Sequence, residues 1–516
     1  MSGAKETNGH FPEPTKNVID VNDHESLKRL NMYACTSVIV ATVISIIHGY
    51  VTSVMSGALL FIKEELKIND QQVQLLAGIL NAFALPGSMV AGRISDVIGR
   101  RYTIMAASLI FMSGSILMGY GPSYPILMIG RCTSGIGAGF ALVIAPVYCS
   151  EISPPSSRGF LTSFPSLFIN VGILLGYVSN YFFGKMSLLL GWRMMLGVAA
   201  LPSLALALIM LTMVESPRWL VMQGRVGEAR RVLLLVSNSH HEAEKRLRDI
   251  KIAVGIDENS NQDVVTVPKK TMSGGGALKE LFCKPSPSVR RILMAGIALH
   301  AFQRLCGNDA MLLYSPRVFG KAGISSTSKL LLATLGIGII KVICTFISGT
   351  LLDRAGRRVM LLISAGGMVV SLVGLSVCLT IVGHSKDKLL WPVSLVIVSV
   401  YAFVGFAALG MGPATWVYSS EIFPLRLRAQ GIGICVLVNR IAGVTVIMSF
   451  ITIYKNITMS GTFFMFTGIT VLAWLFYYFF LPETKGRSLE DMEIIFGGRC
   501  TPEVQMDKAE SNTTDP

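Results

Sequence analysis

The sequence predicts an all-α membrane protein in which twelve transmembrane helices form two six-helix bundles. Three observations favour this fold class. Hydrophobic residues make up 52% of the 516 residues and charged residues 15%, a balance too apolar for soluble domains. About a dozen stretches have the roughly 20 apolar residues that a helix needs to cross about 30 Å of hydrocarbon. Two motifs also recur, once in each half of the chain.

The N-terminal bundle is expected over residues 34–213, after a polar cytosolic tail over 1–33. Each of its helices corresponds to an apolar run of about the length that spans a bilayer. The expected spans are 34–60, 73–95, 103–121, 124–149, 160–183 and 191–213.

A polar insert over 214–290 follows the first bundle. It contains "RVGEARRVLLLV" and "HEAEKRLRDIKIAVG", which have helical periodicity and many charges, and then the glycine-rich break "SGGG". We expect a cytosolic linker with short amphipathic helices.

The C-terminal bundle is expected over residues 291–481, before a second cytosolic tail over 482–516. Its apolar runs have the same length as those of the first bundle. The expected spans are 291–316, 328–352, 359–382, 391–417, 428–453 and 460–481.

The formal net charge of +14 raises the question of a polyanionic partner. Lys and Arg are concentrated in the linker and in alternate loops, as in "GRR" at 99–101, "DRAGRR" at 353–358 and "RLR" at 426–428. This alternation is the positive-inside pattern, and it explains the basic charge without a nucleic-acid partner. With an even number of spans, both termini are expected in the cytosol.

Two pairs of motifs indicate an internal duplication. The segment "GRISDVIGRR" at 92–101 matches "GTLLDRAGRR" at 349–358, and "VYCSEISPPSSR" at 147–158 matches "VYSSEIFPLRLR" at 417–428. The first motif follows the second span of each half, and the second motif follows the fourth. The pattern is typical of a six-plus-six parallel repeat, in which two bundles move about a central site near the bilayer midplane.

The duplicated charges are expected at cytosolic helix ends. There they can pair across the seam between the bundles in one conformation and separate in another, so we interpret them as an intracellular gate. The alternative is that they only fix the topology, but the positive-inside rule requires no acids. The gate residues are Asp96, Arg100, Glu151, Arg158, Asp353, Arg357, Glu421 and Arg428.

The chain contains seven recognisable motifs: "GRISDVIGRR", "GRCTSGIGAGF", "EISPPSSRG", "ESPRWL", "DRAGRR", "GPATWVYSSEIFPLRLRAQG" and "LPETKG". Together they resemble the sugar porter branch of the major facilitator superfamily. The resemblance covers about residues 34–496, and within that branch it is most similar to the plant polyol and monosaccharide transporters. Two stretches carry that finer similarity, "GFLTSFPSLFINVGILLGYVSNYFF" and "SPRWLVMQGR".

This resemblance implies a proton-coupled carrier of linear polyols, cyclitols and monosaccharides in the plasma membrane. A polyol offers only hydroxyl groups and C–H faces, so its site needs amides and an indole, and it can use one charge at membrane depth. Gln303, Asn439 and Trp416 are suited to this task, and the family places similar residue types at the matching positions. For Trp416 the alternative is a packing role.

Two further ionisable residues are expected at membrane depth, Asp309 and Lys341. Both resemble the polyol branch. A mutual ion pair would offset part of the cost of removing each charge from water, and we expect both side chains to face the central site. The alternative is a structural ion pair between neighbouring helices.

One position departs from the family in the first span. Proton-coupled members carry an acid there, in a "GYD" sequence close to an arginine of the fourth span. Arg131 is present here, but Val51 stands in the place of the acid. Because valine cannot titrate, proton coupling is lost unless another group replaces it. His48, one helical turn away, is the candidate, and the alternative is an interfacial histidine.

Two more departures concern the expected substrate site. Ser166 stands where the family usually has Gln or Glu, and Arg304 replaces the second glutamine of a Gln-Gln pair. Arg304 either pairs with Asp309 or extends away from the site, or it meets a carboxylate or phosphate of the substrate.

We therefore predict a carrier of polyols or monosaccharides that works by alternating access. Its coupling to protons is in doubt, because Val51 replaces the expected acid. The alternatives are a facilitator or exchanger of an anionic sugar-like metabolite, and a non-transporting membrane sensor. The retained gate motifs argue against a sensor. No nucleophile and base constellation or metal-ligand set is recognisable, so we expect neither an enzyme nor a cofactor. The expected partners are a small polyol or sugar, protons if coupling persists, and the lipid bilayer.

Overall fold

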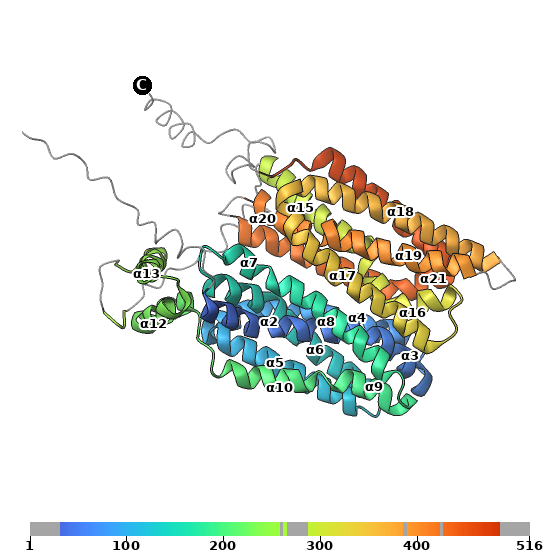
Figure 1. The fold of residues 1–516 in the computed structure, drawn as a ribbon, viewed down its shortest axis with the longest axis horizontal. Helices are drawn as coiled ribbons and strands as arrows, with labels where there is room; N and C mark the ends of the chain where they lie inside the picture. The colour runs from blue at the N-terminus through green and yellow to red at the C-terminus, as the bar shows by residue number, and fades with distance from the viewer. Residues whose placement is uncertain (1–30, 258–261, 266–286, 385–389, 424–426, 486–516) are drawn as a thin grey trace, which may run out of the picture.

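The protein is described by a computed structural model that covers residues 31–257, 262–265, 287–384, 390–423 and 427–485. Within these ranges every regular element is a helix. The helices run side by side and form two bundles, with α2 to α10 in one and α15 to α21 in the other (Figure 1). Most of both expected terminal tails lies outside the described residues.

The N-terminal bundle makes six crossings. Three of them are single helices and three are divided by a short interruption, such as the one at Val54 between the first two helices. Their bounds are α2 (Met32–Ser53), α3 (Met55–Glu65), α4 (Asp70–Ile98), α5 (Arg100–Tyr120), α6 (Tyr124–Ile152), α7 (Arg158–Thr162), α8 (Phe164–Phe183), α9 (Leu188–Gly197) and α10 (Ala200–Met210).

The linker forms three short helices at one end of the molecule, α11 (Pro217–Met222), α12 (Val226–Val236) and α13 (His240–Val254) (Figure 1). Arg246 of α13 donates to backbone carbonyl groups at the end of α6, among them that of Ser153 at 3.2 Å. This contact fixes the linker to the bundle. We call this the linker end, and the opposite end, where α3 meets α16, the α3–α16 end.

The C-terminal bundle repeats the arrangement with different interruptions. Its elements are α15 (Pro287–Leu305), α16 (Asn308–Lys321), α17 (Thr327–Ala355), α18 (Arg357–His384), α19 (Leu390–Phe406), the π-helical turn η1 (Ala407–Met411), α20 (Gly412–Ile422) and α21 (Arg428–Phe480).

Ten helices of the described chain are long and apolar enough to cross a membrane. Two of the expected spans are absent from that number for reasons of local geometry. The seventh is broken between α15 and α16 at Gly307, whose φ is +85°. The eleventh and twelfth are joined as α21, which bends at Thr458 (φ 70°, ψ 163°). With these included the bundles have six crossings each, and the predicted fold class is confirmed.

Two span boundaries differ from the sequence prediction. The seventh span was expected as one run over 291–316, but helix begins at Pro287, stops at Leu305 and resumes from Asn308 to Lys321. The break follows from the left-handed conformation of Gly307, which hydropathy does not report. The tenth span contains η1, where the regular helical hydrogen-bond pattern is interrupted before Pro413.

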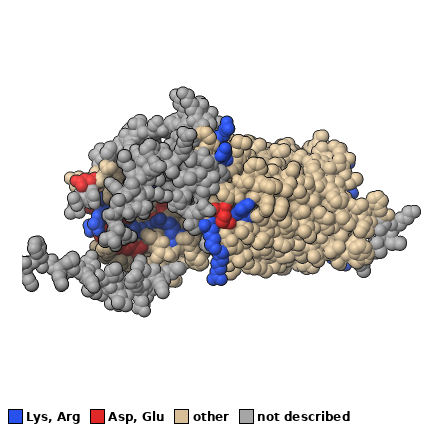
Figure 2. Space-filling view, turned by 90° about the horizontal axis from the view of Figure 1, so that it is seen from above, with Lys and Arg blue, Asp and Glu red and all other residues tan. Residues whose placement is uncertain are grey.

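The outer surface agrees with a membrane location. On the face in Figure 2, charged side chains gather toward the linker end, and the remaining surface is almost entirely uncharged. Large apolar side chains are exposed on this protein, as a lipid-facing surface requires, and they include Leu208, Phe346, Val370 and Phe479. The bundles meet where α8 packs on α17 and α4 packs on α21.

Candidate functional site

A hydrogen-bonded chain of polar side chains links α15, α16 and α21 inside the C-terminal bundle. Asn439 Nδ2 donates to Gln303 Oε1 at 2.7 Å, and Arg304 Nε donates to Asn439 Oδ1 at 2.9 Å. Arg304 also forms a short ion pair with Asp309 at the start of α16. Gln303, Arg304, Asp309 and Asn439 are therefore brought together, and we call them the polar network.

The interrupted helix of the tenth span holds this network in place. Gln303 Nε2 donates to the carbonyl oxygens of Met411 and Gly412, each at 3.0 Å, where η1 passes into α20. These carbonyl groups lie at the junction of η1 and α20, so the junction fixes the position of the Gln303 amide.

Trp416 lies near the polar network. Its ring contacts His300 edge to face, with the ring centroids 5.0 Å apart, and His300 stands one turn before Gln303 on α15. The Trp416 side chain is 38% exposed, so part of the indole face is open. An exposed indole beside two amides offers an apolar surface and polar groups together.

The expected ion pair between Asp309 and Lys341 does not form. Asp309 pairs with Arg304, and no ion pair within 4 Å joins Lys341 to a described acid. Lys341, from α17, still interacts electrostatically with Asp309 and Arg304. The reason is proximity, because Arg304 stands at the end of α15, directly across the break at Gly307 from Asp309.

Arg440 is a cation of this region that the sequence analysis did not select. It directly follows Asn439 on α21, is half-buried, and interacts electrostatically with Arg304 and Asp309. The sequence could have identified it, because Arg440 is a lone arginine within an apolar run.

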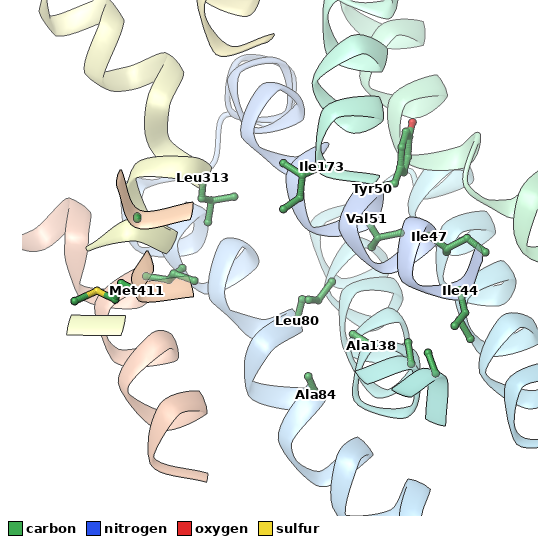
Figure 3. Close-up of a cluster of buried hydrophobic side chains, with 14 of the residues drawn as sticks. Ile44, Ile47, Tyr50, Val51, Leu80, Ala84, Ala138, Ile173, Leu313 and Met411 are labelled. Carbon is green, nitrogen blue, oxygen red and sulfur yellow. The ribbon is translucent and has the colours of Figure 1, made fainter. Parts of the chain in front are cut away.

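Val51 occupies an apolar environment in the N-terminal bundle. It is 1% exposed and lies among Ile47, Leu80, Ala138 and Ile173, as Figure 3 shows. None of the described residues that Figure 3 labels around it is an acid. The position therefore has no titratable group of its own.

Arg131 is buried beside Val51 and is held by backbone carbonyl groups. It donates to the carbonyl oxygens of Val51 at 3.0 Å, Leu76 at 3.3 Å and Ala77 at 3.5 Å. None of the ion pairs between described residues includes Arg131. Three carbonyl dipoles from α2 and α4 thus take the place of a carboxylate.

His48 faces the other bundle. Its side chain is buried, it interacts electrostatically with Arg440 and Arg304, and its Nδ1 atom has no hydrogen-bond partner among the described residues. A proton added there would place a third positive charge beside two guanidinium groups, which is a poor arrangement for a replacement proton carrier.

Ser166 does not reach the polar network. It is exposed in the first turn of α8, and no hydrogen bond connects it to the other described site residues. Asn170, one turn further along α8, makes a contact that the sequence analysis missed. Its Nδ2 atom donates to Thr345 Oγ1 of α17 at 3.0 Å and so joins the two bundles.

Among the described residues, the expected gate residues form ion pairs within each bundle. Arg100 Nε lies 2.9 Å from Glu151, and Arg100 Nη1 lies 3.3 Å from Asp96. In the second half, Arg357 lies 3.0 Å from Glu421. Arg158 forms no ion pair with a described residue, Arg428 donates to the Phe423 carbonyl at 3.3 Å, and the Asp353 side chain lies outside the described residues.

Two further acids complete this duplicated arrangement. Glu215 accepts from the backbone N–H of Arg100 at 2.8 Å, and Glu483 accepts from that of Arg357 at 2.9 Å. Both acids therefore neutralise the start of the following helix. They lie in "ESPRWL" and "LPETKG", which were recognised as motifs but given no role.

At the α3–α16 end, ion pairs connect the two bundles. Asp70 at the start of α4 contacts Lys63 at 2.7 Å, Arg317 of α16 at 3.5 Å and, more closely, Lys455 of α21. One turn along, Gln74 donates to Thr452 Oγ1 of α21 at 3.0 Å. One acid of the N-terminal bundle thus binds two cations of the C-terminal bundle, and we call this group the Asp70 cluster.

Known proteins resemble the chain over nearly its whole length. Residues 37–496 match the family described as "Sugar (and other) transporter". The chain is 57% identical to probable polyol transporter 3 of Arabidopsis thaliana over 93% of each protein, and 54% identical to probable polyol transporter 6 of that plant over 90% of this chain and 95% of the other. The inward open structure of the xylose transporter XylE from E. coli superposes with a TM-score of 0.73, at 25% identity, over 90% of this chain and 100% of that one.

Proposed function

The chain belongs to the sugar transporter family, and from that premise we propose that it carries a polyol or a monosaccharide across a membrane by alternating access, without proton coupling. This proposal rests on the different polar groups that the two bundles hold on either side of the seam. The C-terminal bundle holds an amide-rich polar network, and the N-terminal bundle holds an arginine that has no carboxylate partner among the described residues.

The polar network is suited to hydroxyl groups. The amide oxygens of Gln303 and Asn439 each accept one hydrogen bond in the network and have a second lone pair that could accept a substrate O–H. Both side chains are buried in this conformation, so a substrate reaches them only when the site opens. Arg304 keeps N–H groups beyond the two that it uses. The exposed face of Trp416 supplies an apolar surface for C–H groups.

The absence of proton coupling is proposed from Val51 and Arg131. A carboxylate beside Arg131 could alternate between the arginine and a proton, but backbone carbonyl groups cannot take up a proton at physiological pH. A proton therefore cannot break or restore the hydrogen bond between Arg131 and the Val51 carbonyl, and the proton gradient does not act on it.

Alternating access is supported by the difference between the two ends of the bundles. The Asp70 cluster connects the bundles at the α3–α16 end, whereas the paired gate residues at the linker end connect helices of one bundle. With the basic linker placed in the cytosol by the positive-inside rule, this arrangement corresponds to a carrier closed toward the outside. We place it in the plasma membrane with both termini cytosolic.

Uptake by purified protein in lipid vesicles tests the function. Labelled sorbitol and xylose are expected to exchange against the same unlabelled compound inside, and a proton gradient is expected to produce no accumulation above equilibrium. Accumulation that follows the gradient would contradict the uncoupled mechanism. Failure to exchange any polyol or sugar would favour the non-transporting sensor.

A further inference from the structure

A tyrosine of the N-terminal bundle hydrogen-bonds a backbone carbonyl group of the C-terminal bundle. The hydroxyl group of Tyr177, in α8, donates to the carbonyl oxygen of Leu312, in α16, at 2.9 Å. Tyr177 is 1% exposed, so the bond lies inside the protein, where a polar group that loses its partner is costly. The bond therefore joins α8 to α16 across the seam.

The carbonyl group of Leu312 is available because a proline follows it by one turn. In a regular helix this oxygen would accept from the backbone N–H of residue 316, but Pro316 has no N–H. The hydroxyl group of Ser315 also donates to it, at 3.3 Å. A carbonyl oxygen has two lone pairs, so it can hold both hydroxyl groups and keeps Ser315 if Tyr177 leaves.

The ring of Tyr177 packs against α17 at a glycine. A Cβ atom on Gly338 would lie 2.9 Å from the Tyr177 ring, so the two helices approach this closely only because Gly338 has no side chain. Seven residues away on each helix, Asn170 donates to Thr345 at 3.0 Å. Seven residues make about two helical turns, so both contacts use the same face of α8 and the same face of α17. This face of α8 therefore closes the seam.

The helix that receives the hydrogen bond of Tyr177 also connects the polar network to the Asp70 cluster. Asp309, in the first turn of α16, belongs to the network, and Arg317, further along α16, belongs to the cluster. Leu312 lies between them in the chain. The hydrogen bond thus fixes α16 to the N-terminal bundle between the substrate site and the closed end.

We propose that Tyr177 is a positioning residue of the transport cycle. Its hydrogen bond holds α16 against the N-terminal bundle while the α3–α16 end is closed, and the Leu312 carbonyl keeps Ser315 alone when that end opens. This proposal rests on the proposed carrier function and deepens it. Release leaves the carbonyl with a partner and moves the phenol into the opening between the bundles, where water replaces its lost bond.

Distance measurements by electron paramagnetic resonance test this proposal on the full-length protein in lipid nanodiscs. Spin labels on the ends of α3 and α16 report how far that end is open. Tyr177→Phe removes only the hydroxyl group and is expected to raise the ratio of open to closed populations about fivefold, the typical effect of one hydrogen bond. Ser315→Ala is expected to lower this ratio, because the Leu312 carbonyl then loses its partner in the open state.

A second variant and two controls make the test specific. Gly338→Ala places a methyl group against the Tyr177 ring and is expected to raise the ratio as Tyr177→Phe does. Tyr401→Phe is the control for the lost hydroxyl group, because Tyr401 donates to Ala333 within the C-terminal bundle at 2.8 Å. Gly468→Ala is the control for the added methyl group, since a Cβ atom there meets nothing within 4 Å. Both controls are expected to keep the distances of the unmodified protein, and thermal unfolding verifies that every variant is folded.

This proposal and the carrier function fail separately. Unchanged distances in both Tyr177→Phe and Gly338→Ala, or a shift toward the open state in Ser315→Ala, would overturn the role of Tyr177. The carrier function then stands if labelled sorbitol still exchanges in vesicles. The expected shifts, together with no exchange of any polyol or sugar by the unmodified protein, would support the role of the hydrogen bond in opening and contradict the carrier function.

Discussion

Arg131 keeps a positive charge inside the N-terminal bundle with backbone carbonyl groups as its nearest partners. Burying an ion without a counter-ion is expensive, and hydrogen bonds to carbonyl dipoles recover part of that cost. At the first-span position beside it, Val51 packs among aliphatic neighbours. The proposed loss of proton coupling rests on this apolar side chain.

Val51→Asp is predicted to introduce proton-dependent accumulation. The Val51 carbonyl already lies 3.0 Å from Arg131 Nη1, so a carboxylate on the same residue is within reach of the guanidinium group. Uptake of labelled sorbitol into vesicles with an inward proton gradient measures the effect. Val51→Asn is the matched control, because it has the same size and polarity but cannot titrate; accumulation by Val51→Asn as well would contradict the role of the proton.

Asn439→Leu is predicted to weaken polyol binding about tenfold or more. It removes the acceptor of Arg304 and the donor to Gln303, and each lost hydrogen bond of a buried group costs about 1–3 kcal/mol. The concentration dependence of sorbitol exchange measures the change. Ser449→Ala, which removes a hydroxyl that bonds only within α21, is the control and is expected to exchange like the unmodified protein.

At the scale of single elements, interruptions in helices build the site. The break at Gly307 brings Arg304 and Asp309 together from successive helices, and the carbonyl groups where η1 meets α20 hold Gln303. The same two spans are apolar enough to be read as continuous helices, so their hydropathy gives no indication of the interruption. In membrane helices such irregular backbone is tolerated where protein surrounds it.

Gly307→Ala is predicted to lower the free energy of unfolding by about 1–2 kcal/mol and to reduce polyol exchange. The positive φ of Gly307 disfavours a side chain, and a Cβ there would lie 2.9 Å from the Phe466 ring. Thermal unfolding with a parallel exchange assay measures both effects. Gly320→Ala is the control, because a Cβ there meets nothing within 4 Å; equal stability of the two variants would contradict the prediction.

At the scale of the whole molecule, the two ends of the seam are held differently. At the linker end, the described ion pairs Arg100–Glu151 and Arg357–Glu421 each lie within one bundle, and the Asp70 cluster joins the bundles at the α3–α16 end. In the proposed alternating-access mechanism, this arrangement would be one of the two end states.

Asp70→Asn is predicted to shift the population toward a conformation open at the α3–α16 end. The neutral side chain loses its attraction for Arg317 and Lys455 and leaves three cations close together. Spin labels on the ends of α3 and α16 are expected to show a longer distance population than in the unmodified protein. Asp249→Asn, on exposed α13, serves as control, and an unchanged distance distribution in Asp70→Asn would refute the role of the cluster.

The sequence by itself determined the fold class, the twelve crossings and the duplication, because hydropathy and repeated motifs are local properties of the chain. It also identified Gln303, Asn439 and Trp416 as candidate residues, through a family resemblance that places such types at those positions. The proposed loss of coupling came from Val51 alone, since a missing acid is visible in the sequence.

Only the tertiary structure decided which charges are partners. It paired Asp309 with Arg304 and not with Lys341, added Arg440 to the site, and joined the bundles through Asp70. The physical reason is that an ion pair depends on a few ångströms between residues from different helices. Helix breaks and bundle packing set those distances, and neither is recorded in the pattern of apolar and polar residues.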